Sequence, residues 1–279
     1  MNKTRISWVR NPEGTQGYTW NPITGCLHNC DYCYARKMSH RFEGFPIKTK
    51  FIENASVEQV IDGKTEEFIL EENPGFTPTF WPSRLEDPFK LKGPATFFVC
   101  SMADVFGEWV PGKWIEQIFK VVHDLPLHTF LFLTKNGSRM CSDGDVLDTT
   151  NAWYGQTCTG IADRPIVDIP NFRHFLSFEP LLNNWIPDFN CILVNWIIIG
   201  SLNQNSKPVS PDKGGTKIKW VLSLLSEADK YKIPVFIKPE LYELYPDLPL
   251  RQELPYLKPL PPTGQLLKEG QCLPRNNAG

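Results

Sequence analysis

The chain has 279 residues, of which 41% are hydrophobic, and its 29 basic and 31 acidic residues give a formal net charge of −2. This composition is typical of a globular protein with one large or two small domains, and it excludes the disordered and fibrous classes. The balanced charge excludes a protein that coats nucleic acid through bulk electrostatics, while a local basic groove stays compatible with it.

The sequence also predicts a compartment. No apolar run reaches the ~18 residues that a membrane-spanning helix needs, and residues 1–14 lack the apolar core of a secretory signal. Three of the eight cysteines lie within eight residues, whereas a secreted disulfide scaffold spreads its cysteines over its loops. We therefore expect a cytoplasmic protein without a membrane partner.

The first motif along the chain is the cysteine loop, in which Cys26, Cys30 and Cys33 have the spacing C-x3-C-x2-C. A structural zinc site normally takes four ligands from two separated pairs. The sequence has no second CxxC pair, so zinc would need His28 or a distant cysteine as its fourth ligand. Three thiolates on one short loop favour a [4Fe–4S] cluster in which three irons are anchored and one is free to bind a substrate or cofactor.

Residues 45–75 predict a peripheral hairpin. The dipeptide Asp62-Gly63 is typical of a tight turn, and short apolar runs flank it at 59–61 and 68–70. We interpret this segment as an insertion into the domain.

From residue 95 to residue 237 the chain repeats one pattern, a short apolar run followed by polar residues. Such runs, rich in aromatic and β-branched residues, are typical of strands buried on both faces. Apolar residues at three- and four-residue steps predict amphipathic helices from about 111 and over 218–225. Alternating strands and helices imply a parallel sheet with right-handed crossovers. We expect an α/β fold, a full or partial (β/α) barrel with strands at 95–99, 129–133, 152–155, 174–178, 196–199 and 234–237.

Polar residues at the ends of these strands predict the site, because active sites of (β/α) barrels lie at the carboxyl ends. Glu179 follows an apolar strand, where a carboxylate needs a partner. Structural alternatives remain: a solvated lysine for Lys135, a helix N-cap for Asp104, and local packing or capping for the others. The candidates are Tyr32 in the cysteine loop and, at strand ends, Ser101, Asp104, Lys135, Gln156, Thr157 and Glu179.

The end of the chain differs in composition from the rest. From about residue 240 it is rich in proline and weakly periodic, which predicts an extended segment. We expect a barrel domain over residues 1–240, with the insertion at about 45–75, and a Pro-rich extension over 241–279 that packs on the barrel.

The cysteine loop resembles that of the radical S-adenosylmethionine (radical SAM) superfamily, whose pattern is C-x3-C-x2-C with an aromatic residue before the last cysteine. The surrounding segments 18–25 and 33–36 resemble its phage-associated branch, which is largely of unknown function and distantly similar to spore photoproduct lyase, a DNA-repair enzyme. One departure is that Ser201 and the residues after it replace the second glycine and the acidic residue that relatives carry after Gly200. The likeness covers about residues 16–240 and includes SMADVF at 101–106, FLTK at 132–135, LSFEPL at 176–181, WIIIG at 196–200 and PVFIK at 234–238.

The resemblance implies that the three cysteines hold a [4Fe–4S] cluster whose free iron binds S-adenosylmethionine. Reductive cleavage of that cofactor gives a 5′-deoxyadenosyl radical, which takes a hydrogen atom from a substrate. By the same resemblance Tyr32, Ser101, Lys135, Gln156 and Thr157 contact the cofactor. Glu179 and Asp104 are then the catalytic candidates.

The resemblance leaves the substrate open. A nucleic-acid base is the first candidate and a peptide the second, and the reaction needs an electron donor such as flavodoxin or ferredoxin. An alternative from another class is a structural zinc or iron–sulfur module that binds a partner or nucleic acid without catalysis. Such a module needs the three cysteines, but it does not need Lys135, Gln156 and Glu179 to converge on one mouth.

Overall fold

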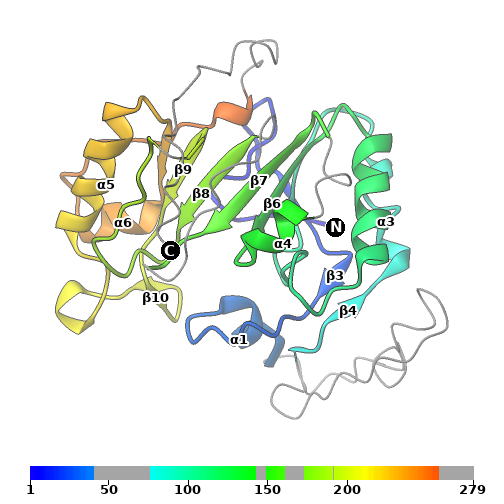
Figure 1. The fold of residues 1–279 in the computed structure, drawn as a ribbon, viewed down its shortest axis with the longest axis horizontal. Coiled ribbons are helices and arrows are strands. Elements are labelled where there is room, and N and C mark those ends of the chain that lie inside the picture. Colours follow the sequence, from blue (N-terminus) through cyan, green and yellow to red (C-terminus); the bar gives the residue numbers. More distant parts are fainter. Residues whose placement is uncertain (41–75, 143–148, 161–172, 191, 258–279) are drawn as a thin grey trace, which may run out of the picture.

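A sheet of eight strands forms the centre of the computed structural model, in the order β1-β2-β5-β6-β7-β8-β9-β12 (Figure 1). The structure describes residues 1–40, 76–142, 149–160, 173–190 and 192–257, so the hairpin predicted at 45–75 lies outside the described residues. The strands are β1 (Asn2–Lys3), β2 (Tyr18–Trp20), β5 (Thr96–Val99), β6 (Thr129–Thr134), β7 (Ala152–Thr157), β8 (His174–Phe178), β9 (Trp196–Ile199) and β12 (Val235–Ile237).

Seven of these strands, from β2 to β12 in the sheet order, pair in parallel. The expected α/β class is confirmed, and all six predicted strands are present, two with the predicted bounds and four with one end shifted by one or two residues. The sheet is not wholly parallel, because β1 pairs antiparallel with β2 at one edge. The sequence pattern did not predict β1 or β2, since two or three residues are too few to show a periodicity.

The remaining elements are short, apart from two helices. The helices are α1 (Tyr34–His40), α3 (Gly112–Asp124), α4 (Gly137–Ser142), α5 (Ile218–Lys230) and α6 (Pro239–Leu244), with single 3-10 turns at Pro82–Arg84, Pro88–Lys90, Pro211–Lys213 and Pro255–Leu257. Two small antiparallel pairs join β3 (Ile23–Thr24) to β4 (Thr79–Phe80) and β10 (Asn203–Gln204) to β11 (Lys207–Pro208). No helix among the described residues is long and apolar enough to cross a membrane.

The two long helices cover one face of the sheet, with α3 over β5 to β7 and α5 over β8, β9 and β12. In Figure 1, α3 lies at the right and α5 at the left of the row of strands. Both match the predicted amphipathic segments, and their apolar residues at three- and four-residue steps are buried. From β5 to β12 the strands follow one another in chain order, so right-handed crossovers place the helices on the same face.

Segments near the two chain ends cover the other face. Trp8 and Tyr256 pack there against Phe98, Trp153 and Trp196, all of them fully or almost fully buried. The Tyr256 hydroxyl donates a hydrogen bond to the Trp8 carbonyl at 2.6 Å. Among the described residues, the apolar floor on this face is therefore sealed by irregular chain and one 3-10 turn rather than by α-helices.

The chain after α6 returns along the outer edge of β12. Ile237 N–H donates to the Arg251 carbonyl at 2.7 Å, and Glu253 N–H donates to the Val235 carbonyl at 3.0 Å. This return covers the backbone edge of β12, which would otherwise be open to pairing with another chain. The start that we predict for the C-terminal extension, residue 241, falls inside α6.

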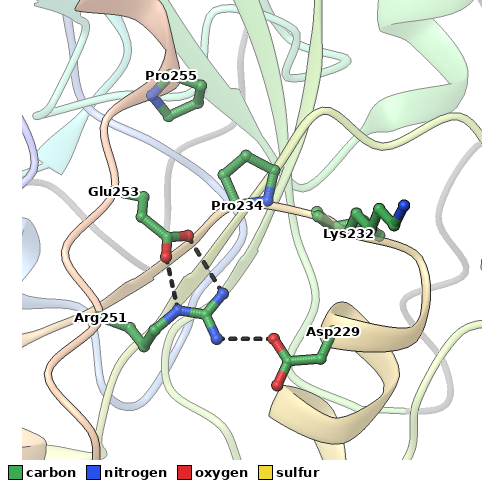
Figure 2. Close-up of a pocket in the computed structure, with 7 residues that line it drawn as sticks. Asp229, Lys232, Pro234, Arg251, Glu253 and Pro255 are labelled. Atoms are coloured by element: carbon green, nitrogen blue, oxygen red, sulfur yellow. Dashed lines mark hydrogen bonds and ion pairs between the residues drawn. The ribbon is translucent and has the colours of Figure 1, made fainter.

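A pocket of about 400 Å³ lies at the amino end of β12 (Figure 2). Its wall carries Arg251, which donates from Nε to Glu253 Oε1 at 2.6 Å and from Nη1 to Asp229 Oδ1 at 2.8 Å. Because one guanidinium binds both carboxylates, we interpret this cluster as a structural link between the returning chain and α5. It lies at the end of the strands opposite to the predicted site.

Gly155 in β7 provides a test of the packing. A Cβ atom at this position would lie 2.2–2.6 Å from atoms of the Phe175 ring. We expect Gly155→Ala to lower the free energy of unfolding by about 1–3 kcal/mol through overpacking, measured as a lower urea midpoint.

The matched control is Gly112→Ala, where a Cβ atom would meet nothing within 4 Å. Its midpoint should stay the same or rise slightly, because alanine restricts the unfolded chain more than glycine does. Equal midpoints for the two variants would contradict this account of the packing at β7.

Candidate functional site

The cysteine loop begins beside the carboxyl end of β5. Gly25 N–H donates to the Met102 carbonyl at 2.8 Å, and Cys26 N–H donates to the Phe76 carbonyl at 3.1 Å. Gly25 has φ +89°, and a Cβ atom there would lie 2.0 Å from the Thr77 carbonyl oxygen. Only glycine fits this close approach, which leads the chain into the loop at a fixed position.

Arg36 of α1 donates hydrogen bonds to several groups of the cysteine loop. Cys33 N–H donates to the Cys30 carbonyl at 3.0 Å and closes a tight turn. The Arg36 guanidinium donates to the same Cys30 carbonyl at 2.6 Å and to the Asn29 side chain. Arg36 N–H donates to Cys33 Sγ at 3.4 Å. Two of the three cysteines are thus held through the first turn of α1.

His28 ties the loop to the sheet. Its Nε2 donates to Asp104 Oδ2 at 2.7 Å, and its ring packs edge-on against Trp109 with centroids 4.9 Å apart. From the sequence we expect His28 to be a loop residue unless zinc needs a fourth ligand. In the structure, the His28 Nε2 is bonded to the Asp104 carboxylate, which favours the role of a loop residue over that of a zinc ligand.

Asp104 is a buried carboxylate, only 5% exposed, with four hydrogen-bond donors. Oδ1 accepts from Phe106 N–H at 3.0 Å and from Thr134 Oγ1 at 2.6 Å. Oδ2 accepts from Lys135 N–H at 2.9 Å as well as from His28. Both oxygens are saturated, so the geometry favours a positioning role for Asp104 over the catalytic role named above.

Tyr32 and Lys135 meet, although they lie about 100 residues apart in the sequence. Lys135 Nζ lies 5.4 Å from the centroid of the Tyr32 ring, a cation–π contact. Burial raises the pKa of Tyr32, whereas the hydrogen bond and charge of Lys135 lower it. The ammonium of Lys135 therefore lies at the cysteine loop, and Tyr32 fixes its direction.

The remaining cofactor candidates occupy different surroundings. Ser101 Oγ donates to Asn21 Oδ1 at 3.2 Å, and the Ser101 carbonyl accepts from the Tyr34 hydroxyl at 2.7 Å. Gln156 and Thr157 are both buried at the end of β7. Because side chains alternate along a strand, they lie on opposite faces of the sheet, and Thr157 shares its face with Ser177, its register partner.

Glu179 forms an ion pair with Lys238, which follows β12. The two side chains are 29% and 13% exposed, and Lys238 Nζ also lies 3.5 Å from Glu240 Oε1. Burial opposes the charge on Lys238, but the two carboxylates outweigh it and raise the pKa of the ammonium. The carboxylate of Glu179 therefore has the partner that its apolar strand requires.

The charges of this ion pair act on Tyr34, the first residue of α1. Desolvation raises the pKa of Tyr34, the residue after Cys33; the charge of Glu179 raises it further, and the charge of Lys238 lowers it. Burial raises the pKa of the Cys26 thiol to about 12, and the charges of Cys33 and Cys30 add to this effect. The Glu179–Lys238 pair is thus within electrostatic reach of the start of α1.

The donor set of the loop fits an iron–sulfur cluster. Cys26, Cys30 and Cys33 are free and partly buried. The backbone N–H of Arg36 already donates to one sulfur, and such bonds tune clusters of this type. Over the described ranges, no group of three or more His, Cys, Asp or Glu side chains is gathered closely enough to hold a metal ion. The number and chemistry of the donors fit, and the thiols do not converge on one point.

Three residues that act in this geometry are absent from the predicted set: His28, Arg36 and Lys238. Lys238 follows an apolar strand in the same way as Lys135, so the strand-end pattern could have identified it. Nothing in the spacing of His28 or Arg36 indicates their contacts, because Asp104 lies 76 positions from His28 and the Cys30 carbonyl carries no side-chain signal.

Comparison with known proteins identifies a family. A family model with the description "Protein of unknown function (DUF5131)" matches residues 3–240. No curated protein and no solved structure matches the chain.

Asp104 allows a test of the connection between loop and sheet. Asp104→Asn keeps the shape but turns one acceptor into a donor that faces donors. We expect the free energy of unfolding of the metal-free protein to fall by about 2–3 kcal/mol, because buried hydrogen bonds to a charged group are lost. Urea denaturation measures this change.

Asp31→Asn makes the same chemical change at an exposed position of the cysteine loop and should leave the midpoint unchanged. If Asp104→Asn were as stable as the wild type, Asp104 would not be the connection that its four contacts indicate.

Proposed function

We propose that this chain, which belongs to the family described as "Protein of unknown function (DUF5131)", is a radical SAM enzyme. The observation that carries the proposal is a loop with three free thiols, tied through His28 and Asp104 to the carboxyl ends of β5 and β6. Parallel α/β sheets place their active sites at this end. The motifs that resemble the superfamily lie at the same end, which supports the proposal.

Cys26, Cys30 and Cys33 would hold a [4Fe–4S] cluster. When bound, the cluster and S-adenosylmethionine supply a reductive cleavage whose product, the 5′-deoxyadenosyl radical, takes a hydrogen atom from the substrate. The chain contributes position: His28 and Arg36 keep the loop in place, and the apolar floor around Leu133 and Phe175 limits the access of water to the reaction.

Lys135 and Tyr32 suit the binding of a cofactor with a carboxylate and a flat base. The Lys135 ammonium is a point charge that attracts a carboxylate, and its contact with the Tyr32 ring directs it. Asp104 accepts the backbone N–H of Lys135 at 2.9 Å, so the start of the lysine side chain is fixed. In this proposal Asp104 acts through Lys135 and His28 and does not touch the cofactor.

We further propose that the sheet is a partial (β/α) barrel. The consecutive strand order and the helices on a single face support this architecture, because both are typical of barrels and of their open relatives. We also propose that the protein acts in the cytoplasm. It would receive single electrons from a donor such as flavodoxin or ferredoxin. The substrate is addressed in the next subsection.

The metal content tests the proposal first. Protein purified without oxygen and reconstituted with iron and sulfide should be brown and hold about four irons per chain. Cys26→Ala, Cys30→Ala and Cys33→Ala should each lose the stable cluster, measured as iron content and visible absorbance.

Cys141→Ala is the matched control, since Cys141 is a free, partly exposed thiol on α4, outside the loop. It should keep the full iron content. Stoichiometric zinc in a colourless, folded protein would replace the enzyme with the structural zinc module.

Lys135→Met tests cofactor binding. With a strong reductant, the reconstituted wild type should convert S-adenosylmethionine slowly to 5′-deoxyadenosine even without a substrate. Loss of a charge-assisted contact should weaken cofactor binding about tenfold or more while the iron content stays constant. Product is measured by chromatography over a range of cofactor concentrations.

Lys120→Met removes an exposed lysine from α3 and should leave this reaction unchanged. If Lys135→Met bound and cleaved the cofactor as well as the wild type, the role assigned to Lys135 would be wrong.

A further inference from the structure

The three residues that directly follow three neighbouring strands form one row across the sheet. Strands β8, β9 and β12 are adjacent and parallel, and their last residues are register partners. Side chains alternate along a strand, so the residues after them lie on the face of Ile198 and Phe236, which is opposite the face that α3 and α5 cover. The row consists of Glu179, Gly200 and Lys238.

Gly200 makes the contact between the outer two possible. A Cβ atom there would lie 2.8 Å from Glu179 Cγ and 3.1 Å from Lys238 Cδ. The two side chains therefore meet across the glycine. A larger residue at this position would push both of them aside.

The ion pair leaves one acceptor and one donor open. Glu179 uses Oε1 for Lys238, and Oε2 takes part in no hydrogen bond with any residue that the structure describes. A lysine ammonium has three N–H donors, and Glu179 and Glu240 face two of them. One N–H of Lys238 thus remains for a ligand, on the same ion pair that leaves Oε2 of Glu179 open.

A hydroxyl group without a partner lies near the pair on the same face. Ser177 lies two residues before Glu179 on the same face and is fully buried. Its Oγ has no hydrogen-bond partner within the described part of the chain. Buried hydroxyl groups without a partner are rare in proteins, so this position adds an unsatisfied polar group two residues before Glu179.

An adjacent donor and acceptor select for a particular ligand chemistry. The Lys238 ammonium disfavours a cation, and the two carboxylates disfavour an anion, so a neutral polar edge fits best. A trans peptide bond directs its N–H and C=O in opposite directions and cannot use both groups. The edge of a nucleobase carries a donor and an acceptor side by side.

We propose that Glu179 and Lys238 form the substrate-binding subsite of this protein, and that it takes the hydrogen-bonding edge of a nucleobase. Glu179 accepts from an N–H of the base, and Lys238 donates to the neighbouring oxygen or nitrogen. Tyr34, which is 53% exposed at the start of α1, offers an aromatic ring on which a base can stack. The inference rests on the proposed radical SAM function, whose substrate it specifies.

Binding of defined probes tests the subsite without any turnover. Equilibrium dialysis of the metal-free and the reconstituted protein would use guanosine, uridine and a short single-stranded oligonucleotide. We expect binding, and we expect 1-methylguanosine and 3-methyluridine to bind about tenfold more weakly, because the methyl group replaces the N–H donor. Binding of the oligonucleotide alone would place the base in a strand, and binding of the nucleosides would show that a free base suffices.

Two variants connect the binding to the row. Glu179→Gln exchanges an acceptor for a donor, and Gly200→Ala displaces both side chains without a change of charge. Each should weaken binding about tenfold or more, with circular dichroism as the check of folding. Glu243→Gln, on an exposed position of α6, makes the same charge change as Glu179→Gln and should have no effect.

Several results would overturn the subsite. They are the absence of nucleoside and oligonucleotide binding, binding that both variants leave unchanged, and equal competition by acetamide, which would point to a carboxamide side chain of a peptide. These results are separate from the iron content and from the cleavage of S-adenosylmethionine. An intact cluster without base binding would refute only the subsite, and base binding without a cluster would refute only the radical SAM activity.

Discussion

The burial of Asp104 sets the geometry at the carboxyl end of the sheet. A charge in the interior is costly unless hydrogen bonds satisfy it, and the four donors to Asp104 come from the cysteine loop, from its own loop and from the end of β6. None of these segments can shift without leaving a buried oxygen unpaired. The cysteine loop, which has little secondary structure of its own, is thus positioned by a carboxylate that lies 76 residues away from His28 in the sequence.

The face of the sheet that Trp8 and Tyr256 cover changes from apolar to polar along each strand. Alternation places Phe175, Ser177 and Glu179 on one face of β8 and its extension, and it places Phe236 and Lys238 on that face beside β12. The apolar residues lie at the sealed end, under Trp8 and Tyr256, and the polar ones lie at the carboxyl end. One period-two pattern therefore places the apolar floor and the polar groups of the proposed subsite on the same face.

Two clusters of ion pairs in this chain differ in what they leave open. At the amino end of β12, Arg251 forms ion pairs with Glu253 and Asp229 and joins the returning chain to α5 (Figure 2). At the carboxyl end, Lys238 and Glu179 keep one donor and one acceptor without a protein partner among the described residues. The first arrangement is complete without a ligand and stabilises the fold. The second keeps these two groups available for the neutral polar edge that we propose as its ligand.

The sequence by itself determined the class of the fold, the six main strands and the two long helices, because buried strands and amphipathic helices have periodicities that nearby residues reveal. It also singled out the cysteine loop, Lys135 and Glu179, since residue type and strand-end position carry that signal. Only the tertiary structure decided that Asp104 holds His28, that Tyr32 meets Lys135 and that Lys238 meets Glu179 across Gly200. These contacts join segments tens of residues apart, and such pairings depend on strand order and register, which no local pattern encodes.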